Sequence, residues 1–345
     1  MDEKKQETPV ENDQGKRMKT VLFLLLCILG GAFIYFYAFD HWPAKGMVTI
    51  DIPKEASGRE IGDRLEEKGV IRSSMIFRAM IIATGNQKAL QSGHYRMHQG
   101  LTVKEAIEEL KSGREDVETV TVPEGYTAAR IAELLKKAGI SGGEDFLAEA
   151  SSYAPASYMY GPEPAEIKGE GFLFADTYEI PKAYTARQIC DLMYKRTDEM
   201  LAADIRKQAE KKKLTIHELM TIASMVEREA RFKEDQEKIA SVILARLEKG
   251  MRLQIDATVQ YALGRQKAEL SLGDTKVDSP YNTYIRNGLP PGPIGSPGMD
   301  AIRAVLKAEP GEYLYYVAEK DGHHVFTKTY EEHEAEVSRI YGSDG

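Results

Sequence analysis

The chain has 345 residues, about two domains' worth, and 42% of them are hydrophobic, so it can bury a sizeable core. Its formal net charge of −8 argues against a nucleic-acid-binding surface, because such surfaces carry a basic footprint. Two cysteines exclude both a disulfide framework and a cysteine-based zinc site.

The N-terminal region contains one candidate membrane span. Val21–Phe39 runs for 19 residues without a charged side chain. As a helix this run extends about 28 Å, close to the roughly 30 Å hydrocarbon core of a bilayer. Three basic residues lie just before it: Lys16, Arg17 and Lys19. The positive-inside rule therefore predicts a cytoplasmic tail at residues 1–19, a transmembrane helix at 20–40 and an extracytoplasmic remainder.

A cleaved signal peptide is the alternative for this segment. Its cleavage site would need small residues in an A-x-A-like pattern. The end of the run instead carries bulky aromatic residues that suit the outer membrane interface: Tyr35, Phe36, Tyr37, Phe39 and Trp42. Lipid modification of Cys27 would need a small preceding residue, and Leu26 is not small. We therefore expect an uncleaved single-pass anchor in the plasma membrane.

Two segments that lie about 70 residues apart share one pattern. Each begins as an alternating strand that ends at a proline, continues as an amphipathic helix and closes at a glycine. The first runs from Val48–Pro53 to Gly69, and the second from Val120–Pro123 to Gly139. Internal repetition explains the match, but strand–helix–glycine is also a common pattern, and two copies do not decide between these interpretations.

Further elements follow from local signals. Capping boxes, in which a Ser or Thr precedes a Glu by three residues, predict helix starts at four positions: Ser57, Thr102, Thr215 and Thr329. Between these positions the chain is expected to be irregular over residues 153–170, helical over 186–213, helical from Thr215 through Arg231, and helical again up to Gly250. Proline and glycine predict an ordered loop over residues 278–298, and Asp321-Gly322 predicts a hairpin between 313–318 and 324–327.

Metal, nucleophile and phosphate-binding motifs are incomplete in this sequence. His217-Glu218 begins like a metalloprotease helix, but Thr221 stands where the second histidine is needed. A hairpin and an exposed helix account for the other clustered histidines: His323, His324 and His333. The sequence has no G-x-S-x-G motif and no phosphate-cradling glycine loop. We therefore expect neither a metal site nor a cofactor.

One carboxyl has the surroundings expected of a general acid. Within the helical stretch Ile222–Arg231, Glu227 lies at the edge of an apolar stripe. Its neighbours one or two turns away are apolar: Met220, Ala223 and Ala230. Partial burial would raise the pKa of Glu227 and keep it protonated near neutrality, as general acid catalysis requires.

Two other interpretations of this helix remain open. Glu227 is spaced to pair with Arg231 on a solvated helix face. Glu229 is the competing acid, although it leans toward other side chains: Met225, Phe232 and Lys233. The residue pattern by itself does not decide among these roles.

Four segments, in this order, carry a resemblance to a known family: Glu170–Tyr178 (EGFLFADTY), Ala223–Ala230 (ASMVEREA), Gly250–Val259 (GMRLQIDATV) and Asp278–Pro297 (DSPYNTYIRNGLPPGPIGSP). The single anchor and Tyr313–Val317 add to this resemblance. Residues 48 to about 340 therefore resemble the endolytic murein transglycosylases, the MltG or YceG-like family. The chain departs from that family at Ala175 and Ala257, where the family usually has proline. These departures bear on local loop shape rather than on chemistry.

The resemblance implies an enzyme that cuts the β-1,4 bond between N-acetylmuramic acid and N-acetylglucosamine within nascent glycan strands. It cuts without water, leaves 1,6-anhydro ends and so limits strand elongation. The resemblance places the family's acid/base glutamate on Glu227. Because the sugar's own 6-hydroxyl is the nucleophile, one carboxyl replaces the usual pair. Substrate binding is implied for polar and aromatic residues of the matched segments: Gln254, Asp256, Ser279, Tyr281, Asn282, Thr283 and Tyr284.

The implied architecture is α+β. A LysM-like unit of small α/β elements would occupy residues 41–119. A mixed α/β catalytic region would occupy residues 120–340, with its core at about 165–340, and a tail would occupy residues 341–345.

The implied partners are peptidoglycan strands and wall synthases of the penicillin-binding class, with no nucleic acid. The alternative is a non-catalytic glycan-binding scaffold that recruits synthases; a metallohydrolase acting on wall peptides lacks its ligands.

Overall fold

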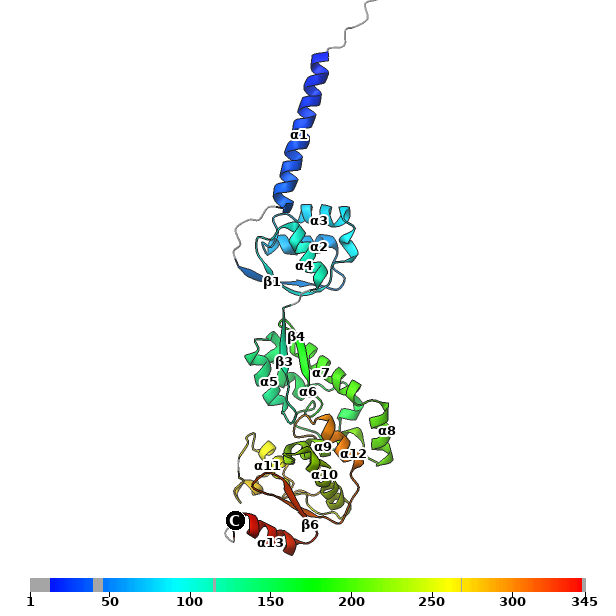
Figure 1. Ribbon diagram of the computed structural model, residues 1–345, viewed down its shortest axis with the longest axis vertical. Helices are drawn as coiled ribbons and strands as arrows, with labels where there is room; N and C mark the ends of the chain where they lie inside the picture. Colours follow the sequence, from blue (N-terminus) through cyan, green and yellow to red (C-terminus); the bar gives the residue numbers. More distant parts are fainter. Residues whose placement is uncertain (1–12, 40–45, 114–115, 268, 343–345) are drawn as a thin grey trace, which may run out of the picture. The chain divides into compact units, whose positions relative to one another are not determined.

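The computed structural model describes residues 13–39, 46–113, 116–267 and 269–342, and in the first range the side chains of residues 18–31. The chain folds as two compact units, residues 1–116 and 117–345 (Figure 1). Both units combine helices with two-stranded antiparallel sheets, which confirms the expected α+β class.

Helix α1 spans Asp13–Phe39 and includes the expected membrane span. Within the described part of the chain, none of the helices has the length and apolar character that crossing a membrane requires. Residues 1–12, Trp42 and the side chains of Lys16, Arg17 and the aromatic residues from Tyr35 to Phe39 lie outside what the structure describes. The membrane anchor therefore stays a prediction.

The first unit has a β-α-α-β order followed by one more helix. Strand β1 (Met47–Ile52) pairs antiparallel with β2 (Gly93–His98). Helices α2 (Gly58–Glu67) and α3 (Ser74–Ala83) lie between them in the chain, and α4 (Val103–Ser112) follows. The apolar faces of these elements bury a core that includes Leu65, Phe77 and Leu110.

The second unit opens with the same order, made of β3 (Val117–Thr121), α5 (Ala128–Lys137), α6 (Phe146–Ser152) and β4 (Thr177–Pro181), with the two strands antiparallel. Strand β3 begins 70 residues after β1, and helix α5 begins 70 residues after α2. Both first helices end alike, because Gly69 and Gly139 take left-handed φ angles of 72° and 70°. Their N–H groups donate to the carbonyls three residues earlier at 2.9 and 3.0 Å. The 70-residue pattern is therefore a true structural repetition.

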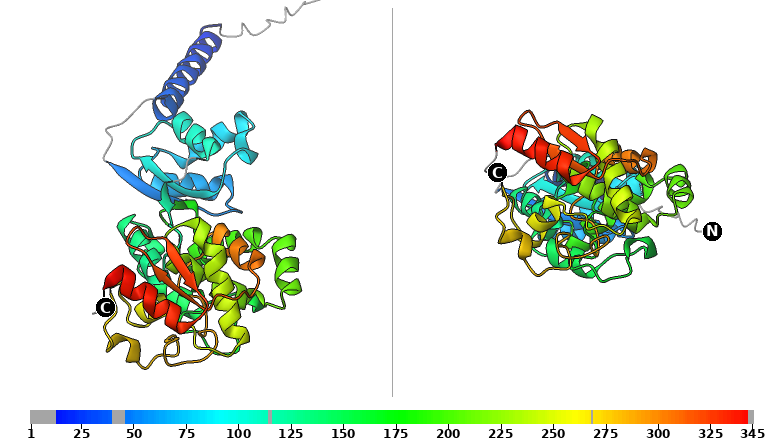
Figure 2. Two further views of the ribbon diagram at one scale, coloured as in Figure 1. Left: turned by 60° about the horizontal axis from the view of Figure 1, so that its bottom comes forward. Right: turned by 90° about the horizontal axis from the view of Figure 1, so that it is seen from below.

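The remaining elements are mostly helical (Figure 2). They are α7 (Ala186–Met200), α8 (Ala203–Lys211), α9 (Ile216–Glu229), α10 (Lys233–Glu248), α11 (Asp256–Ala262), α12 (Met299–Lys307), β5 (Tyr315–Ala318), β6 (His324–Thr327) and α13 (Tyr330–Tyr341). The helical stretch expected over 186–213 is two helices, because Leu201 leaves the helical backbone conformation with a ψ of 51°. Helix α9 ends at Glu229 rather than at Arg231, because Ala230 is extended. The four capping boxes and the β5–β6 hairpin are confirmed.

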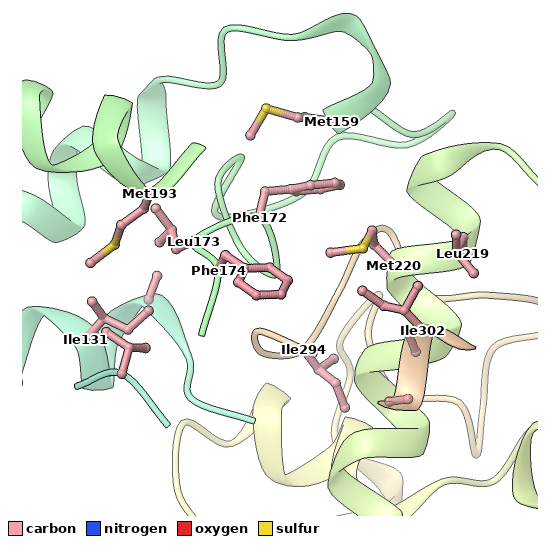
Figure 3. Close-up of a cluster of buried hydrophobic side chains, with 14 of the residues drawn as sticks. Ile131, Met159, Phe172, Leu173, Phe174, Met193, Leu219, Met220, Ile294 and Ile302 are labelled. Atoms are coloured by element: carbon pink, nitrogen blue, oxygen red, sulfur yellow. The ribbon is translucent and has the colours of Figure 1, made fainter. Parts of the chain in front are cut away.

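Helix α9 belongs to the core of the second unit. It packs against α10 and α12. Its Met220 belongs to a buried cluster with Phe172, Ile294 and Ile302, which come from three other segments (Figure 3). This packing fixes α9 against the loop that contains Ile294.

Two glycines in the left-handed region provide a matched test of this packing. Gly139 (φ 70°) has open space where a Cβ would lie, whereas at Gly171 (φ 78°) the Cβ would lie 2.2 Å from the Cβ of Pro293. A left-handed non-glycine residue costs roughly 1–2 kcal/mol. Gly139→Ala should lower the free energy of unfolding by about that amount, and Gly171→Ala by clearly more. Chemical denaturation measures both, and equal losses would contradict the close packing of residue 171 on Pro293.

Candidate active site

Residues 292–298 (GPIGSPG) lie along α9 and are tied to it through their backbone. The Ser224 hydroxyl accepts a hydrogen bond from the N–H of Ile294 at 3.0 Å. Arg228 Nη1 donates to the Ile294 carbonyl at 3.2 Å. Glu227 Oε2 accepts from the N–H of Gly298 at 3.1 Å. Three side chains of one helix thus hold the 292–298 loop, and the last of them is the expected acid.

The 292–298 loop also contacts the turn that follows β3. Ser296 N–H donates to the Tyr126 carbonyl and Gly125 N–H donates to the Ser296 carbonyl, both at 2.8 Å. A Cβ at Gly298 would lie 1.8 Å from Glu124 Oε1, so the carboxyl of Glu124 approaches this loop where only glycine fits. These contacts bring residues 124 and 125 beside Glu227, although they are about 100 positions apart in the sequence.

Glu227 is half-buried, and burial raises the pKa of its carboxyl to about 6. The Gly298 N–H opposes this rise because it favours the charged form. The nearby carboxyls of Glu124 and Asp300 raise the pKa further, whereas Lys233 lowers it. A carboxyl with this pKa keeps a protonated fraction near neutrality and can act as both general acid and general base.

Arg231 was the alternative partner expected for Glu227. Among the described residues, no ion pair joins Glu227 to Arg231. The guanidinium of Arg231 instead lies near Phe232, with its carbon 5.7 Å from the ring centre, and against the backbone of Gly322. Glu227 is therefore available for chemistry rather than held in a surface ion pair.

The competing acid, Glu229, has different surroundings from those expected. It was expected to lean toward Met225, Phe232 and Lys233. In the structure its Oε1 accepts a hydrogen bond from Ala257 N–H and its Oε2 one from the Tyr316 hydroxyl, both at 3.2 Å. Burial raises the pKa of Glu229 to about 7. The expectation failed because α9 ends at Glu229, so that segments distant in sequence surround this side chain.

Glu229 lines a polar cavity of about 530 Å³, which we call the tyrosine cavity. Three of the expected substrate-binding residues also line it: Gln254, Asp256 and Tyr284. The Tyr284 hydroxyl donates to Asp256 Oδ1 at 2.5 Å, and Gln254 is exposed with a left-handed φ of 51°. The structure thus places these three residues together on the Glu229 side of the helix end.

The other four expected substrate residues lie in the part of the chain before the 292–298 loop, where they hold that segment in place. Tyr281, Asn282 and Thr283 are at most 1% exposed. Asn282 Nδ2 donates to the carbonyls of Thr275 and Val277, and the Thr283 hydroxyl accepts from Ile255 N–H. Ser279 is half-exposed, and its hydroxyl accepts from Tyr281 N–H at 3.2 Å. A role in substrate contact stays a prediction for these residues.

Several site residues were not identified from the sequence. Aromatic and imidazole rings of the hairpin and α13 line the tyrosine cavity: Tyr315, Tyr316, His324, Tyr330 and His333. His333 stacks on Tyr315, with ring centres 5.4 Å apart.

A third carboxyl with a raised pKa, Glu170, was also not identified. It is fully buried, its Oε1 accepts from Ala128 N–H and its Oε2 from the Tyr261 hydroxyl, and burial raises its pKa to about 7. Glu170 lay in a matched segment, but no local signal indicated its burial.

The described part of the chain contains no group of three or more His, Cys, Asp or Glu side chains placed to hold a metal ion. The clustered histidines have other contacts. His324 Nδ1 lies 3.2 Å from Asp235 Oδ2, and His323 stacks on Phe232 with ring centres 4.1 Å apart. The chemistry that this arrangement can perform is proton transfer at carboxyl groups.

The backbone N–H of Ala257 is predicted to lower the pKa of Glu229, and a substitution at residue 257 can test this. Proline, usual in the resembled family at this position, has no N–H and could not donate the hydrogen bond that Ala257 gives to Glu229. That bond favours the charged carboxylate, so Ala257→Pro should raise the pKa of Glu229 above its present value of about 7. NMR titration of the carboxyl carbon measures the shift. Ala175→Pro, the other departure, is the control and should leave this pKa unchanged; a Glu229 pKa that stays put or falls in Ala257→Pro would contradict the assignment.

Comparison with known proteins supports a family assignment. The model of the YceG-like family matches residues 50–339. A protein named "Endolytic murein transglycosylase" from Bacillus subtilis (strain 168) is 35% identical over 322 residues, which cover 89% of each chain. A protein of the same name from Streptococcus pneumoniae (strain D39) is 32% identical over 357 residues. That alignment covers 94% of this chain but 64% of the Streptococcus protein, so the chain spans less than two thirds of that relative.

A solved structure agrees with the sequence comparisons. The crystal structure of a YceG-like protein from Listeria monocytogenes matches with a TM-score of 0.58 and 32% sequence identity. The match covers 84% of this chain and 99% of that one. With a family model that spans most of the sequence and a solved relative of the same fold, the chain belongs to the YceG-like family.

Proposed function

We propose that this protein is a membrane-anchored endolytic lytic transglycosylase of peptidoglycan. It would cut the β-1,4 bond between N-acetylmuramic acid and N-acetylglucosamine within nascent strands. The single observation that carries this proposal is Glu227, a half-buried carboxyl with a raised pKa and no ion-pair partner among the described residues. The printed names of the Bacillus and Streptococcus relatives support the reaction class.

The proposed reaction needs one carboxyl. Protonated Glu227 gives its proton to the glycosidic oxygen, so that the bond between muramic acid C1 and this oxygen breaks and the N-acetylglucosamine side leaves as an alcohol. The 6-hydroxyl of the same muramic acid then bonds to C1 and gives its proton to the Glu227 carboxylate. This regenerates the acid, consumes no water and leaves a 1,6-anhydro end. A hydrolase would need a second carboxyl to activate water or to act as nucleophile.

The tyrosine cavity is the proposed site for the neighbouring sugar. Asp256, Gln254 and Glu229 offer acceptors and donors to sugar hydroxyls, and the ring of Tyr284 offers a surface for a pyranose face. Charge on Glu229 is not required for this role, because a protonated carboxyl still donates and accepts hydrogen bonds.

The first unit and α1 have proposed roles outside the chemistry. The large apolar side chains of α1 between Val21 and Leu29 are 50–67% exposed, and exposed apolar surface of this extent calls for a membrane or a partner. We assign α1 to the plasma membrane, the LysM-like unit to glycan binding, and wall synthases of the penicillin-binding class to the partners. In this arrangement the catalytic unit lies outside the cell.

Exchange of the acid provides a direct functional test. Glu227→Gln keeps the size of the side chain but removes the transferable proton, so strand cleavage should fall by about 10²–10⁴-fold. In the wild type the rate should decline as the pH rises above about 6, because Glu227 then loses its proton. Cleavage of purified glycan strands, followed by chromatography, measures both effects.

Two glutamine variants serve as controls for Glu227→Gln. On glycan strands without peptides, Glu218→Gln should change little, because Gln also completes the capping box with Thr215. Glu229→Gln should leave catalysis nearly unchanged, because the amide keeps a donor and an acceptor in the tyrosine cavity. If Glu229→Gln is inactive and Glu227→Gln is normal, Glu229 is the acid; if neither variant loses activity but strands still bind, the chain is a scaffold.

The proposed topology has its own test. Protease added to intact spheroplasts should remove residues 46–345 and spare the N-terminal tail, because the basic residues before α1 keep that tail in the cytoplasm. Immunoblotting with antibodies against each end measures the result. Full protection of the C-terminal end would overturn the assignment.

A further inference from the structure

The second unit contains a cavity of about 720 Å³ that the proposed reaction does not use. We call it the His217 cavity. It lies among α8, α9 and α10, and the segments around Pro162, Leu289 and Pro310 close it. Its volume falls within the range of small-ligand sites. Its apolar lining comes from leucines and prolines: Leu214, Leu244, Leu247, Leu289, Pro162, Pro290, Pro291 and Pro310.

His217 supplies an unpartnered polar group to this cavity. The residue is 4% exposed, and its ring centre lies 6.2 Å from that of Phe172. The hydrogen bond of His217 found among the described residues is made by its carbonyl, not by a ring nitrogen. The ring edge lies against two glycines, since a Cβ would lie 2.5 Å from its Cε1 at Gly161 and 3.4 Å from its Nε2 at Gly292. Burial lowers the pKa of His217, so the ring is neutral at pH 7, with one donor and one acceptor. A peptide N–H can donate to the acceptor nitrogen, or a peptide carbonyl can accept from the donor nitrogen.

Charges of both signs surround the mouth of the cavity. Lys211, Lys213, Glu163 and Glu248 line it and are exposed. Lys212, Glu218 and Glu309 also line the cavity. The Nζ of Lys212 donates to the Ala308 carbonyl and to Glu309 at 2.7 Å, and Glu218 completes the capping box of α9. An apolar floor, a neutral imidazole and a rim of mixed charge fit a short peptide that carries carboxylates, an amine and small apolar side chains. A purely anionic or purely aliphatic ligand would leave part of this lining unmatched.

The His217 cavity and Glu227 lie along one track. Leu289, Pro290 and Pro291 line the cavity, and the 292–298 loop that follows them runs along α9 to Glu227. His217 and Glu227 are ten positions apart on one helix, a distance of about 15 Å along the axis. An extended peptide of about five residues reaches about 17 Å. A peptide attached to a sugar at Glu227 is therefore long enough to reach His217.

We propose that the His217 cavity binds the short peptide that murein carries on its muramic acid residues, and that this contact selects peptide-bearing strands. The inference rests on the proposed function, because it takes the substrate to be murein. The peptide's amide pairs with the His217 ring, its alanine side chains lie on the leucine and proline floor, and its carboxylates and amine meet the rim. The occupied cavity then fixes which muramic acid lies at Glu227.

The test compares two substrates that differ in the peptide alone. Strands with intact peptides and strands stripped by an amidase are cleaved by the full-length wild type and its variants. We expect the wild type to show about tenfold higher kcat/KM on peptide-bearing strands. His217→Leu, which removes the donor and acceptor, and Lys211→Glu should each reduce this preference about 3- to 10-fold, since one hydrogen bond is worth about that factor. The rate on stripped strands should be unchanged.

Lys207→Glu is the matched charge control, because Lys207 is exposed on α8 one turn before Lys211 and does not line the cavity. Its preference should equal that of the wild type. Equal loss on both substrates in His217→Leu and Lys211→Glu, or a wild type with no preference, would overturn the proposal.

A binding measurement separates this proposal from the proposed function. Calorimetry of the full-length Glu227→Gln variant with the free pentapeptide L-Ala-γ-D-Glu-L-Lys-D-Ala-D-Ala should show binding that His217→Leu weakens. Failure of the wild type to cleave either strand would reject the transglycosylase function, while this measurement would still decide the cavity. Binding of laurate but not of the peptide would identify an amphiphile site and overturn the proposal.

Discussion

The hydrogen bonds between α9 and the backbone of the 292–298 loop are the constraint on which the site depends. Ser224 and Arg228 hold the N–H and the carbonyl of Ile294, and Glu227 holds the N–H of Gly298. Because backbone groups in a buried loop need partners, these bonds fix the loop and the acid together. The same loop contacts the turn after β3 and leads from the His217 cavity to Glu227. The 292–298 loop thus contacts Glu227 and the charged groups around it, and it leads to the His217 cavity.

The end of α9 divides the site into two sides. Glu227 and Glu229 are two residues apart, and burial raises the pKa of both, yet their partners differ. Glu227 faces a glycine N–H and the charges of residues 124, 233 and 300, whereas Glu229 faces a tyrosine hydroxyl and the tyrosine cavity. We infer that a strand crossing the helix end meets the acid on one side and a sugar-sized polar cavity on the other. One short helix segment can therefore supply both catalysis and binding.

Local features were predictable, and features built from distant segments were not. Capping boxes and the hairpin depend on neighbouring residues and follow from the sequence. The 70-residue pattern was visible in the sequence, but the sequence left open whether it was a true repetition. The partial burial of Glu227 followed from the helical period of its neighbours. Strand β4 pairs with β3 at Thr121 and Thr177, which are 56 positions apart, and no local pattern specifies that register. The surroundings of Glu229 come from Ala257 and Tyr316, 28 and 87 residues away, so helical periodicity could not reveal them.

The central claim is that Glu227 breaks the glycosidic bond with the sugar's own 6-hydroxyl as nucleophile. Digestion of glycan strands in water labelled with oxygen-18, followed by mass spectrometry of the new muramic acid ends, tests this claim directly. The account predicts unlabelled ends that are lighter by one water than a reducing end. Ends that carry oxygen-18 and the full mass of a reducing sugar would show that water is the nucleophile and would contradict the single-carboxyl mechanism.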